Sequence, residues 1–382
     1  MKKSTFALIL IITLLTTLNG DFIISGENNP EEDLIYPKKI LEGPDKNIYI
    51  YDSQDAFIKV FSPEGKFLRK IGGKGEGPGQ FKRSDAADFG FTPDGRSIYF
   101  TEFFRGHKWI TFLDPDGKLK KTLKYNFTGN YGVLRSFIHN EEMIFLQRER
   151  SGKEIRKGDI YYAHYISELI IMNSKGRETT IVLTRENPST ISFVRRGGDT
   201  GIPFNPLFLW GITKRGNVLF TDGTKNYLKL LNRQGKLLKN ITIPVAQAQP
   251  VTKKDLDEWR TRRKEFHNNR NRSWYKEFGS VIEKYTNSIF KYKPSILGMQ
   301  ITPTGNILLQ CRTEKEDLFD YLLTDDNGKL LVKLTSPFFK IKITKSYIIV
   351  RLFTDDEETK IFIMNRQSSE EKDLTKVESI NM

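Results

Sequence analysis

A repeated pattern in the chain places a polar or reactive residue at the end of each of six short apolar runs. These residues are Asp52, Glu102, Gln147, Asp222, Cys311 and Arg351. Carboxylate and amide oxygens can accept hydrogen bonds or coordinate a cation, and a guanidinium can bind an anion. We predict that all of them except Cys311, which we expect to pack as a small apolar residue, contact a ligand. The alternative is structural, because Asp and Gln at strand ends also make turn and capping hydrogen bonds.

Two further groups of side chains could bind a ligand. Arg195 and Arg196 lie just before two glycines, in a segment that contains no repeat pattern, and Trp274 and Tyr275 lie within the basic segment 267–276. Basic and aromatic residues interleaved in this way can stack on sugars or bases and contact anions. We include all four in the predicted ligand-binding set. The alternative for Trp274 and Tyr275 is a lid whose apolar stripe packs on the rest of the protein while its charged face is solvated.

Recognisable catalytic signatures are missing from the sequence. It contains no Gly-x-Ser-x-Gly, no phosphate-binding glycine loop followed by Lys-Ser or Lys-Thr, and no His-Glu-x-x-His. The four histidines are scattered without metal-ligand spacing, and the single cysteine has no partner for a Cys-x-x-Cys pair or a disulfide. We therefore name no catalytic residue, metal ligand or cofactor.

The elements that must position these residues are short strands in a recurring unit. In the first copy, Ile48–Asp52 and Phe57–Phe61 are apolar runs, and a Glu-Gly turn at 64–65 follows. The second copy repeats this order with Asp-Gly turns at 94–95 and 116–117. Such pairs supply the positive φ that tight hairpins require, and Ile, Val, Phe and Tyr favour strands. Six copies predict an all-β, six-bladed propeller of four-stranded antiparallel blades.

The two sets of tight turns predict different faces of the ring. Turns at 44–47, 93–95, 140–142, 214–217 and 303–306 join first to second strands, and those at 63–65, 115–117, 174–176, 233–235 and 326–328 join third to fourth strands. Both sets lie on one side, the tight-turn face. Long irregular segments, expected at 148–160, 184–206 and 243–295, lie on the opposite side, the loop-rich face. We predict the binding site there, over the central channel.

A helical insertion is predicted at about 250–290, between blades 4 and 5. Thr252 and Asp255 resemble a capping box, and Leu256 and Trp259 begin a pattern of near-helical spacing. We expect it to form a lid on the ring.

One segment makes a family resemblance specific. Ile71–Phe81, with the sequence IGGKGEGPGQF, is similar to the linker between blades of NHL-repeat propellers, and IYIYD and FSPEGKF before it resemble the body of that repeat. The resemblance is strongest over 44–124 and implies a six-bladed propeller of an exported bacterial type. It implies no single activity, because this fold hosts binding proteins, scaffolds, lactonases and lyases.

The resemblance leaves one enzymatic alternative open. Lactonase-like propellers bind calcium through oxygens drawn from several blades, so Asp52, Glu102 and Asp222 could supply a calcium site for a lactonase- or esterase-like hydrolase. Arg351 in the same ring would repel the cation.

The N-terminus indicates export. Lys2 and Lys3 precede an apolar run from Phe6 to Leu18, which predicts a signal peptide at 1–20, with an uncleaved membrane anchor as the alternative. We expect a linker at 21–33, the propeller at 34–382, and no other membrane span. The net charge of +14 is dispersed along the chain rather than striped, and the signal argues against RNA binding.

Together these features predict an exported protein, periplasmic or extracellular. It would act as a binding or scaffold module for a peptide, glycan or partner protein on its loop-rich face, without nucleic acid.

Overall fold

The structure is a computed structural model of residues 1–382. It describes residues 22–24, 34–81, 87–104, 107–125, 132–140, 143–157, 160–193, 199–201, 204, 207–245, 248–269, 292–315, 318–337, 340–353, 359–366, 369–370, 372–374 and 377.

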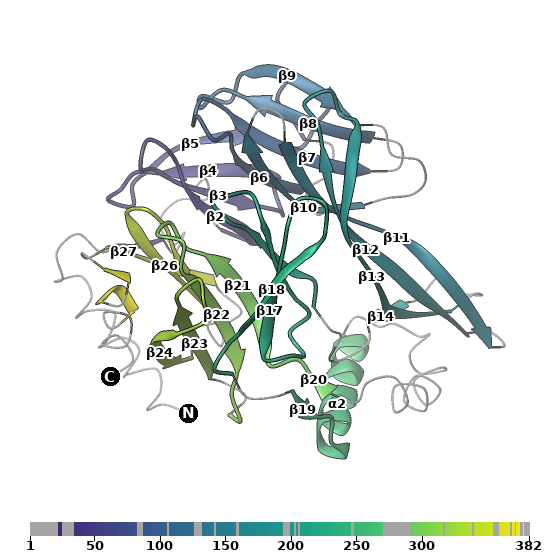
Figure 1. The fold of residues 1–382 in the computed structure, drawn as a ribbon. Helices are drawn as coiled ribbons and strands as arrows, with labels where there is room; N and C mark the ends of the chain where they lie inside the picture. Colours follow the sequence, from purple (N-terminus) through teal and green to yellow (C-terminus); the bar gives the residue numbers. More distant parts are fainter. Residues whose placement is uncertain are drawn as a thin grey trace.

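Six antiparallel sheets stand around a common axis and form the predicted propeller (Figure 1). Blade 1 comprises β2 (Pro37–Glu42), β3 (Ile48–Asp52), β4 (Phe57–Phe61) and β5 (Phe67–Gly72). Blade 2 comprises β6 (Ala87–Phe91), β7 (Ile98–Phe104), β8 (His107–Leu113) and β9 (Leu119–Lys124). Blade 3 has five strands: β10 (Gly132–Asn140), β11 (Met143–Lys157), β12 (Ile160–Met172), β13 (Glu178–Phe193) and β14 (Asp199–Gly201).

The second half of the chain forms the remaining blades. Blade 4 comprises β15 (Leu209–Ile212), β16 (Val218–Thr221), β17 (Tyr227–Leu231) and β18 (Leu237–Thr242). Blade 5 comprises β21 (Ile296–Ile301), β22 (Ile307–Arg312), β23 (Phe319–Thr324) and β24 (Leu330–Ser336). Blade 6 comprises β25 (Lys340–Ile343), β26 (Tyr347–Phe353), β27 (Thr359–Asn365) and, from the other end of the chain, β1 (Phe22–Ile24).

The hairpin turns lie where the sequence predicts them. The glycine that ends each third-to-fourth-strand turn has a positive φ, from Gly65 in blade 1 to Gly328 in blade 5. At Gly235 a Cβ atom would also overlap the carbonyl oxygen of Val182 in the neighbouring blade. These turns therefore need glycine for conformation and, at Gly235, for close packing between blades.

The core is divided into six apolar clusters, one for each junction between neighbouring blades. Tyr51 and Phe100, for example, meet edge to face between blades 1 and 2, with ring centroids 5.2 Å apart. Ile48 and Ile50 of blade 1 pack with Ile349 and Ile363 of blade 6, which closes the ring. Each fully buried aliphatic or aromatic side chain stabilises the fold by about 1.5–3 kcal/mol, so the stability resides between blades.

The N-terminal strand supplies the outer edge of the last blade. β1 pairs antiparallel with β27, with Phe22 opposite Ile363 and Ile24 opposite Ile361. The expectation of a linker over 21–33 is therefore wrong for these three residues. The error arose because three residues carry too little periodicity to reveal a strand whose partner lies at the far end of the chain.

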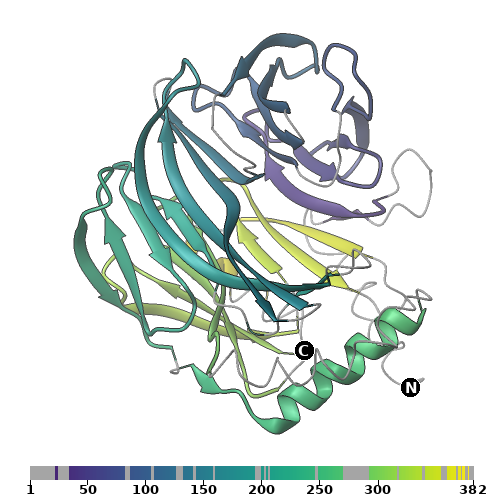
Figure 2. The ribbon, with the colours of Figure 1, turned by 90° about the vertical axis from the view of Figure 1, so that its right-hand side faces the viewer.

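Blade 3 departs from the sequence prediction. The segments 148–160 and 184–206 were expected to be irregular, but β11, β12 and β13 are long strands that pair almost to their ends, with Lys157 opposite Ile160 and Ile160 opposite Phe193. In Figure 1 they extend beyond the rest of the ring, and Figure 2 shows these strands from the right-hand side of that view. Backbone pairing between the three strands forms this extension even though charged residues interrupt the apolar pattern.

The insertion contains the predicted helix, α2 (Lys253–Asn269), flanked by the short paired strands β19 (Gln249–Pro250) and β20 (Tyr292–Lys293). It follows β18 and precedes β21, the last and first strands of the fourth and fifth sheets counted from β2. Thr252 and Asp255 form the predicted cap: the Thr252 backbone N–H and hydroxyl donate to the Asp255 carboxylate at 2.8 and 2.7 Å. No helix in the described part of the chain is long and apolar enough to cross a membrane.

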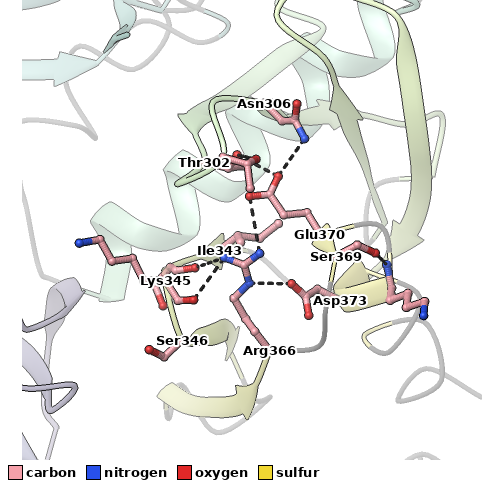
Figure 3. A network of polar contacts seen from close by, with 12 residues as sticks. Thr302, Asn306, Ile343, Lys345, Ser346, Arg366, Ser369, Glu370 and Asp373 are labelled. Atoms are coloured by element: carbon pink, nitrogen blue, oxygen red, sulfur yellow. Dashed lines mark hydrogen bonds and ion pairs between the residues drawn. The ribbon is translucent and has the colours of Figure 1, made fainter. Parts of the chain in front are cut away.

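The C-terminal segment packs on the tight-turn face of blades 5 and 6 (Figure 3). Glu370 accepts hydrogen bonds from the Thr302 hydroxyl at 2.9 Å and from the Asn306 amide at 3.1 Å. Arg366 pairs with the fully buried Asp373 at 2.8 Å. The segment is thus part of the folded domain.

Truncating Leu374 tests this conclusion. Its side chain is fully buried among residues of blades 5 and 6, so Leu374→Ala should lower the free energy of unfolding by about 2–5 kcal/mol in urea titrations. Leu238→Ala, at a position that is 50% exposed, is the control and should change it by less than about 0.5 kcal/mol. Equal effects would show that the C-terminal segment does not contribute to the core.

Candidate functional site

Charged side chains gather near the axis, on the innermost strands of four blades. They are Lys39 on β2, Asp88 on β6, Arg135 on β10, and Lys340 and Lys342 on β25. Lys39, Asp88, Arg135 and Lys340 lie in the first half of their strands, away from the turn to the second strand and therefore towards the loop-rich face. Lys342 is the third of the four residues of β25. We call these five residues the axial cluster.

Asp88 is the only carboxylate of the axial cluster, and its oxygens are already bonded. Lys39 Nζ lies 2.6 Å from Asp88 Oδ1. The other oxygen, Oδ2, accepts from the backbone N–H of Ser136 at 2.7 Å and from its hydroxyl at 3.1 Å. Asp88 thus joins the innermost strands of blades 1, 2 and 3, and one of the four cations is neutralised.

Two other cations are held by backbone carbonyl groups of the next blade. Lys342 Nζ donates to Ile40 O at 2.7 Å, from blade 6 to blade 1. Arg135 Nη1 donates to Trp210 O at 2.9 Å, and its guanidinium lies 4.9 Å from the Trp210 ring centroid. These bonds fix the positions of the cationic groups but leave other donors on each of them, because an ammonium has three N–H bonds and a guanidinium five.

Lys340 differs from the other cations. Among the residues that the structure describes, its ammonium group donates no hydrogen bond and forms no ion pair. Lys340 is an exposed residue, as is Arg135, yet both are surrounded by protein on several sides, as expected for groups lining the axis of a ring. Burial, followed by the charges of Arg351, Arg135 and Lys39, lowers the pKa of Lys340 below its ordinary value.

The same crowding acts on Lys342. Burial is the largest cause, and Lys39, Lys340 and Arg135 add to it, while Asp88 opposes it; together they lower the pKa of Lys342 to about 7. The ammonium groups of Lys340 and Lys342 therefore lie in a positive field that one carboxylate does not balance.

The predicted ligand residues lie one strand farther from the axis. Asp52 is fully buried, and its carboxylate accepts from the backbone N–H groups of Ile35 at 2.6 Å and of Tyr36 and Gln54, each at 3.0 Å. The Lys59 ammonium lies 3.8 Å away. Asp52 therefore holds in place the segment that leads into blade 1. This is the structural role given above as the alternative to ligand binding.

Three other predicted residues stand beside the inner strands in register. Gln147 lies opposite Arg135, and its Oε1 accepts from Trp210 Nε1 at 2.7 Å. Arg351 lies opposite Lys340, and burial lowers its pKa. Glu102 lies opposite Ala87 and is 8% exposed. Gln147 and Arg351 are thus the cross-strand neighbours of two cations of the axial cluster.

Asp222 borders a separate surface hollow of about 300 Å³ in blades 3 and 4. Burial alone would raise its pKa, but hydrogen bonds from Thr224 and the ion pair with Arg185 at 2.7 Å lower it. Its carboxylate is thereby held in the charged form beside Arg185.

The remaining predictions are constrained differently. Arg195, Arg196, Trp274 and Tyr275 lie outside the described residues. Within the part of the chain that the structure describes, no group of three or more His, Cys, Asp or Glu side chains could hold a metal ion. Of the three carboxylates of the calcium alternative, Asp52 and Asp222 have the partners given above. Cys311 is buried in the core between blades 4 and 5, where burial raises its thiol pKa to about 12.

The axial cluster was not predicted from the sequence, because the candidate residues were taken from the ends of the second strands. The first strand of blade 6 carries a short alternation of charged and apolar residues, Lys340-Ile341-Lys342-Ile343. Ile341 and Ile343 face the core between blades 5 and 6, so the two lysines share the opposite face. That alternation of lysine and isoleucine was the signal in the sequence from which the cluster could have been predicted.

Comparisons with known proteins agree with this fold. Residues 30–188 match the model of the DUF5128 family, described as 6-bladed beta-propeller. A search of curated proteins found no match. The propeller architecture is therefore supported both by the structure and by this match, whereas the finer resemblance to NHL repeats stays a prediction.

Solved structures of bacterial proteins are similar over most of the chain. A member of the duf4221 family from Bacteroides vulgatus is 9% identical, with a TM-score of 0.51 over 91% of this chain and 98% of that one. A protein of Bacteroides fragilis described as exported is 11% identical, with a TM-score of 0.48 over 91% and 95%. Virginiamycin B lyase of Staphylococcus aureus is 13% identical, with a TM-score of 0.41 over 91% and 99%. At 9% identity, the similarity to the duf4221 family member shows the fold alone.

Replacing Lys342 tests the electrostatics of the axial cluster. Between about pH 7 and 10.5 the unfolded chain binds a proton at Lys342 that the folded protein lacks. The stability of the wild type should therefore rise with pH through this range relative to Lys342→Met, whose relative stability is greatest at or below pH 7. Urea unfolding from pH 6 to 10 measures the difference. The exposed Lys345, replaced in the same way, is the control, and a pH-independent difference for both variants would contradict the assignment.

Proposed function

We propose that this protein is an exported binding or scaffold module that holds a peptide, glycan or partner protein on its loop-rich face. The observation that carries the proposal is the axial cluster, in which three of the four cations, Lys39, Arg135 and Lys340, lie in the half of the inner strand nearer this side. Exposed charges such as Lys340 and Arg135 are suited to recognising a ligand, and the bonds of Arg135 and Lys342 to backbone carbonyls arrange these side chains before the ligand arrives.

The shape of the ring supports the choice of face. The long strands of blade 3 and the insertion with α2 both add backbone to the ring, and the paired end of β11 and start of β12 lie on the loop-rich face (Figure 1). The other side consists of tight turns and the packed C-terminal segment. Added segments above a rigid scaffold are the usual place for a binding site.

Export is supported by the sequence. Lys2, Lys3 and the apolar run to Leu18 have the order of a signal peptide. The chain has a single cysteine, which is buried, so it can form no internal disulfide in an oxidising compartment.

Site-selective blocking tests which face binds. Cys311 is buried, so a new surface thiol can be labelled selectively. Gln54→Cys lies in the exposed turn between β3 and β4 on the loop-rich face, and Glu64→Cys lies in the exposed turn between β4 and β5 on the tight-turn face. Each variant is coupled to a 5-kDa polyethylene glycol maleimide (on the order of the size of a small domain) and applied to arrays of defined glycans and peptides.

We expect the label at Gln54→Cys to weaken binding of the array ligands at least about tenfold, equal to about 1.4 kcal/mol, while the label at Glu64→Cys leaves it unchanged. Loss of binding only with the Glu64→Cys label would place the ligand on the tight-turn face. Binding to no arrayed glycan or peptide would also contradict the proposal.

A further inference from the structure

The axial cluster has more positive charge than its surroundings neutralise. It holds four cationic side chains and one carboxylate, and that carboxylate already binds Lys39 and Ser136. Like charges brought together in a partly dehydrated place repel one another, and each also loses hydration. The lowered pKa values of Lys340 and Lys342 are the consequence. A cluster of this kind is stabilised by an anion.

Blade-to-blade bridging explains only part of the cluster. Lys39, Arg135 and Lys342 each bond to a group on a neighbouring blade, so each has a structural reason to be there. Lys340 has no such bond among the described residues, yet it stands next to the other cations and opposite Arg351. A purely structural role would leave this exposed ammonium in a repulsive field with nothing gained.

The cationic groups also converge from different strands. Lys340 and Lys342 come from one face of β25, Lys39 from β2 and Arg135 from β10, so their N–H donors approach the axis from three blades. The inner strands of blades 4 and 5 are uncharged in their described parts, from Leu209 to Ile212 and from Ile296 to Ile301. One side of the axis is thus cationic and the other neutral, which suits an anionic group attached to an uncharged body.

We propose that the axial cluster binds an oxyanion group of the ligand, that is a carboxylate, sulfate or phosphate, with Lys340 as the direct contact and Lys39, Arg135 and Lys342 completing the site. The inference rests on the proposed function and specifies the chemistry of its ligand. Ammonium and guanidinium groups together match an oxyanion, because each oxygen can accept several charge-assisted hydrogen bonds. A bound anion would also favour the charged form of Lys342, so binding near pH 8 takes up a proton.

Titration calorimetry of the mature protein with sodium acetate, sulfate and phosphate tests the site. Every titration is run at one ionic strength kept constant with sodium chloride, so that general screening is equal in all of them. We expect saturable binding of at least one of the three anions, and the anion that binds most tightly identifies the group on the ligand. Binding near pH 8 should take up protons, seen as heats that differ between buffers of different ionisation enthalpy.

Two matched variants locate the bound anion. Lys340→Gln removes the charge of the direct contact and should raise the dissociation constant of the anion at least about tenfold. Lys345→Gln removes an exposed charge from the turn that ends the same inner strand, on the tight-turn face, and should leave binding unchanged. Both replace exposed residues, so folding is expected to be preserved, and thermal unfolding without anion checks it.

Lys342→Met provides a second measure that does not depend on Lys340. It should abolish the proton uptake near pH 8 while leaving weaker anion binding. No saturable binding of any of the three anions, or equal loss with Lys340→Gln and Lys345→Gln, would overturn the inference. These results can be distinguished from those of the labelling test. If no anion binds but the label at Gln54→Cys still weakens binding of the array ligands, the ligand lies on the loop-rich face and is not anionic.

Discussion

The burial of both faces of every blade is the constraint on which the rest of this structure depends. A four-stranded sheet rich in Ile, Val, Phe and Tyr has two apolar faces and cannot cover either of them alone. Stacking the blades around an axis covers both, and the six interblade clusters, including the one between blades 6 and 1, leave none exposed at an end of the series. The ring is therefore a rigid frame whose inner strands all begin on the same side.

That frame explains why charged groups can gather at the axis. An inner strand can pack one face into a core cluster while its alternate residues approach the axis. In β25, Ile341 and Ile343 pack in the core, and Lys340 and Lys342 approach the axis. Hydrogen bonds between neighbouring inner strands, such as Arg135 to Trp210 and Lys342 to Ile40, then hold the cations in place. The same bonds that join the blades also arrange the candidate site in advance of any ligand.

The sequence predicted the architecture better than the site. Glycines such as Gly65 and Gly235 indicate turns by conformation alone, so local chemistry was enough to count blades and to place the helix after Thr252. Asp52 was expected to contact a ligand because of its position at a strand end, but only the structure shows backbone N–H groups around its carboxylate. The axial cluster combines residues from four blades, and no local pattern reveals which strand beginnings meet. Which terminal strand closes the ring could not be predicted for the same reason, because the partner of β1 is remote.

The pairing of β1 with β27 constrains the order of folding. Phe22 and Ile363 come from opposite ends of the chain, so the last blade is incomplete until nearly the whole polypeptide has been made. Until then the partial ring exposes the apolar faces of its terminal blades, and contacts of such long sequence separation form slowly. Closure of the ring is therefore a late step, which has to wait until both ends of the chain are present.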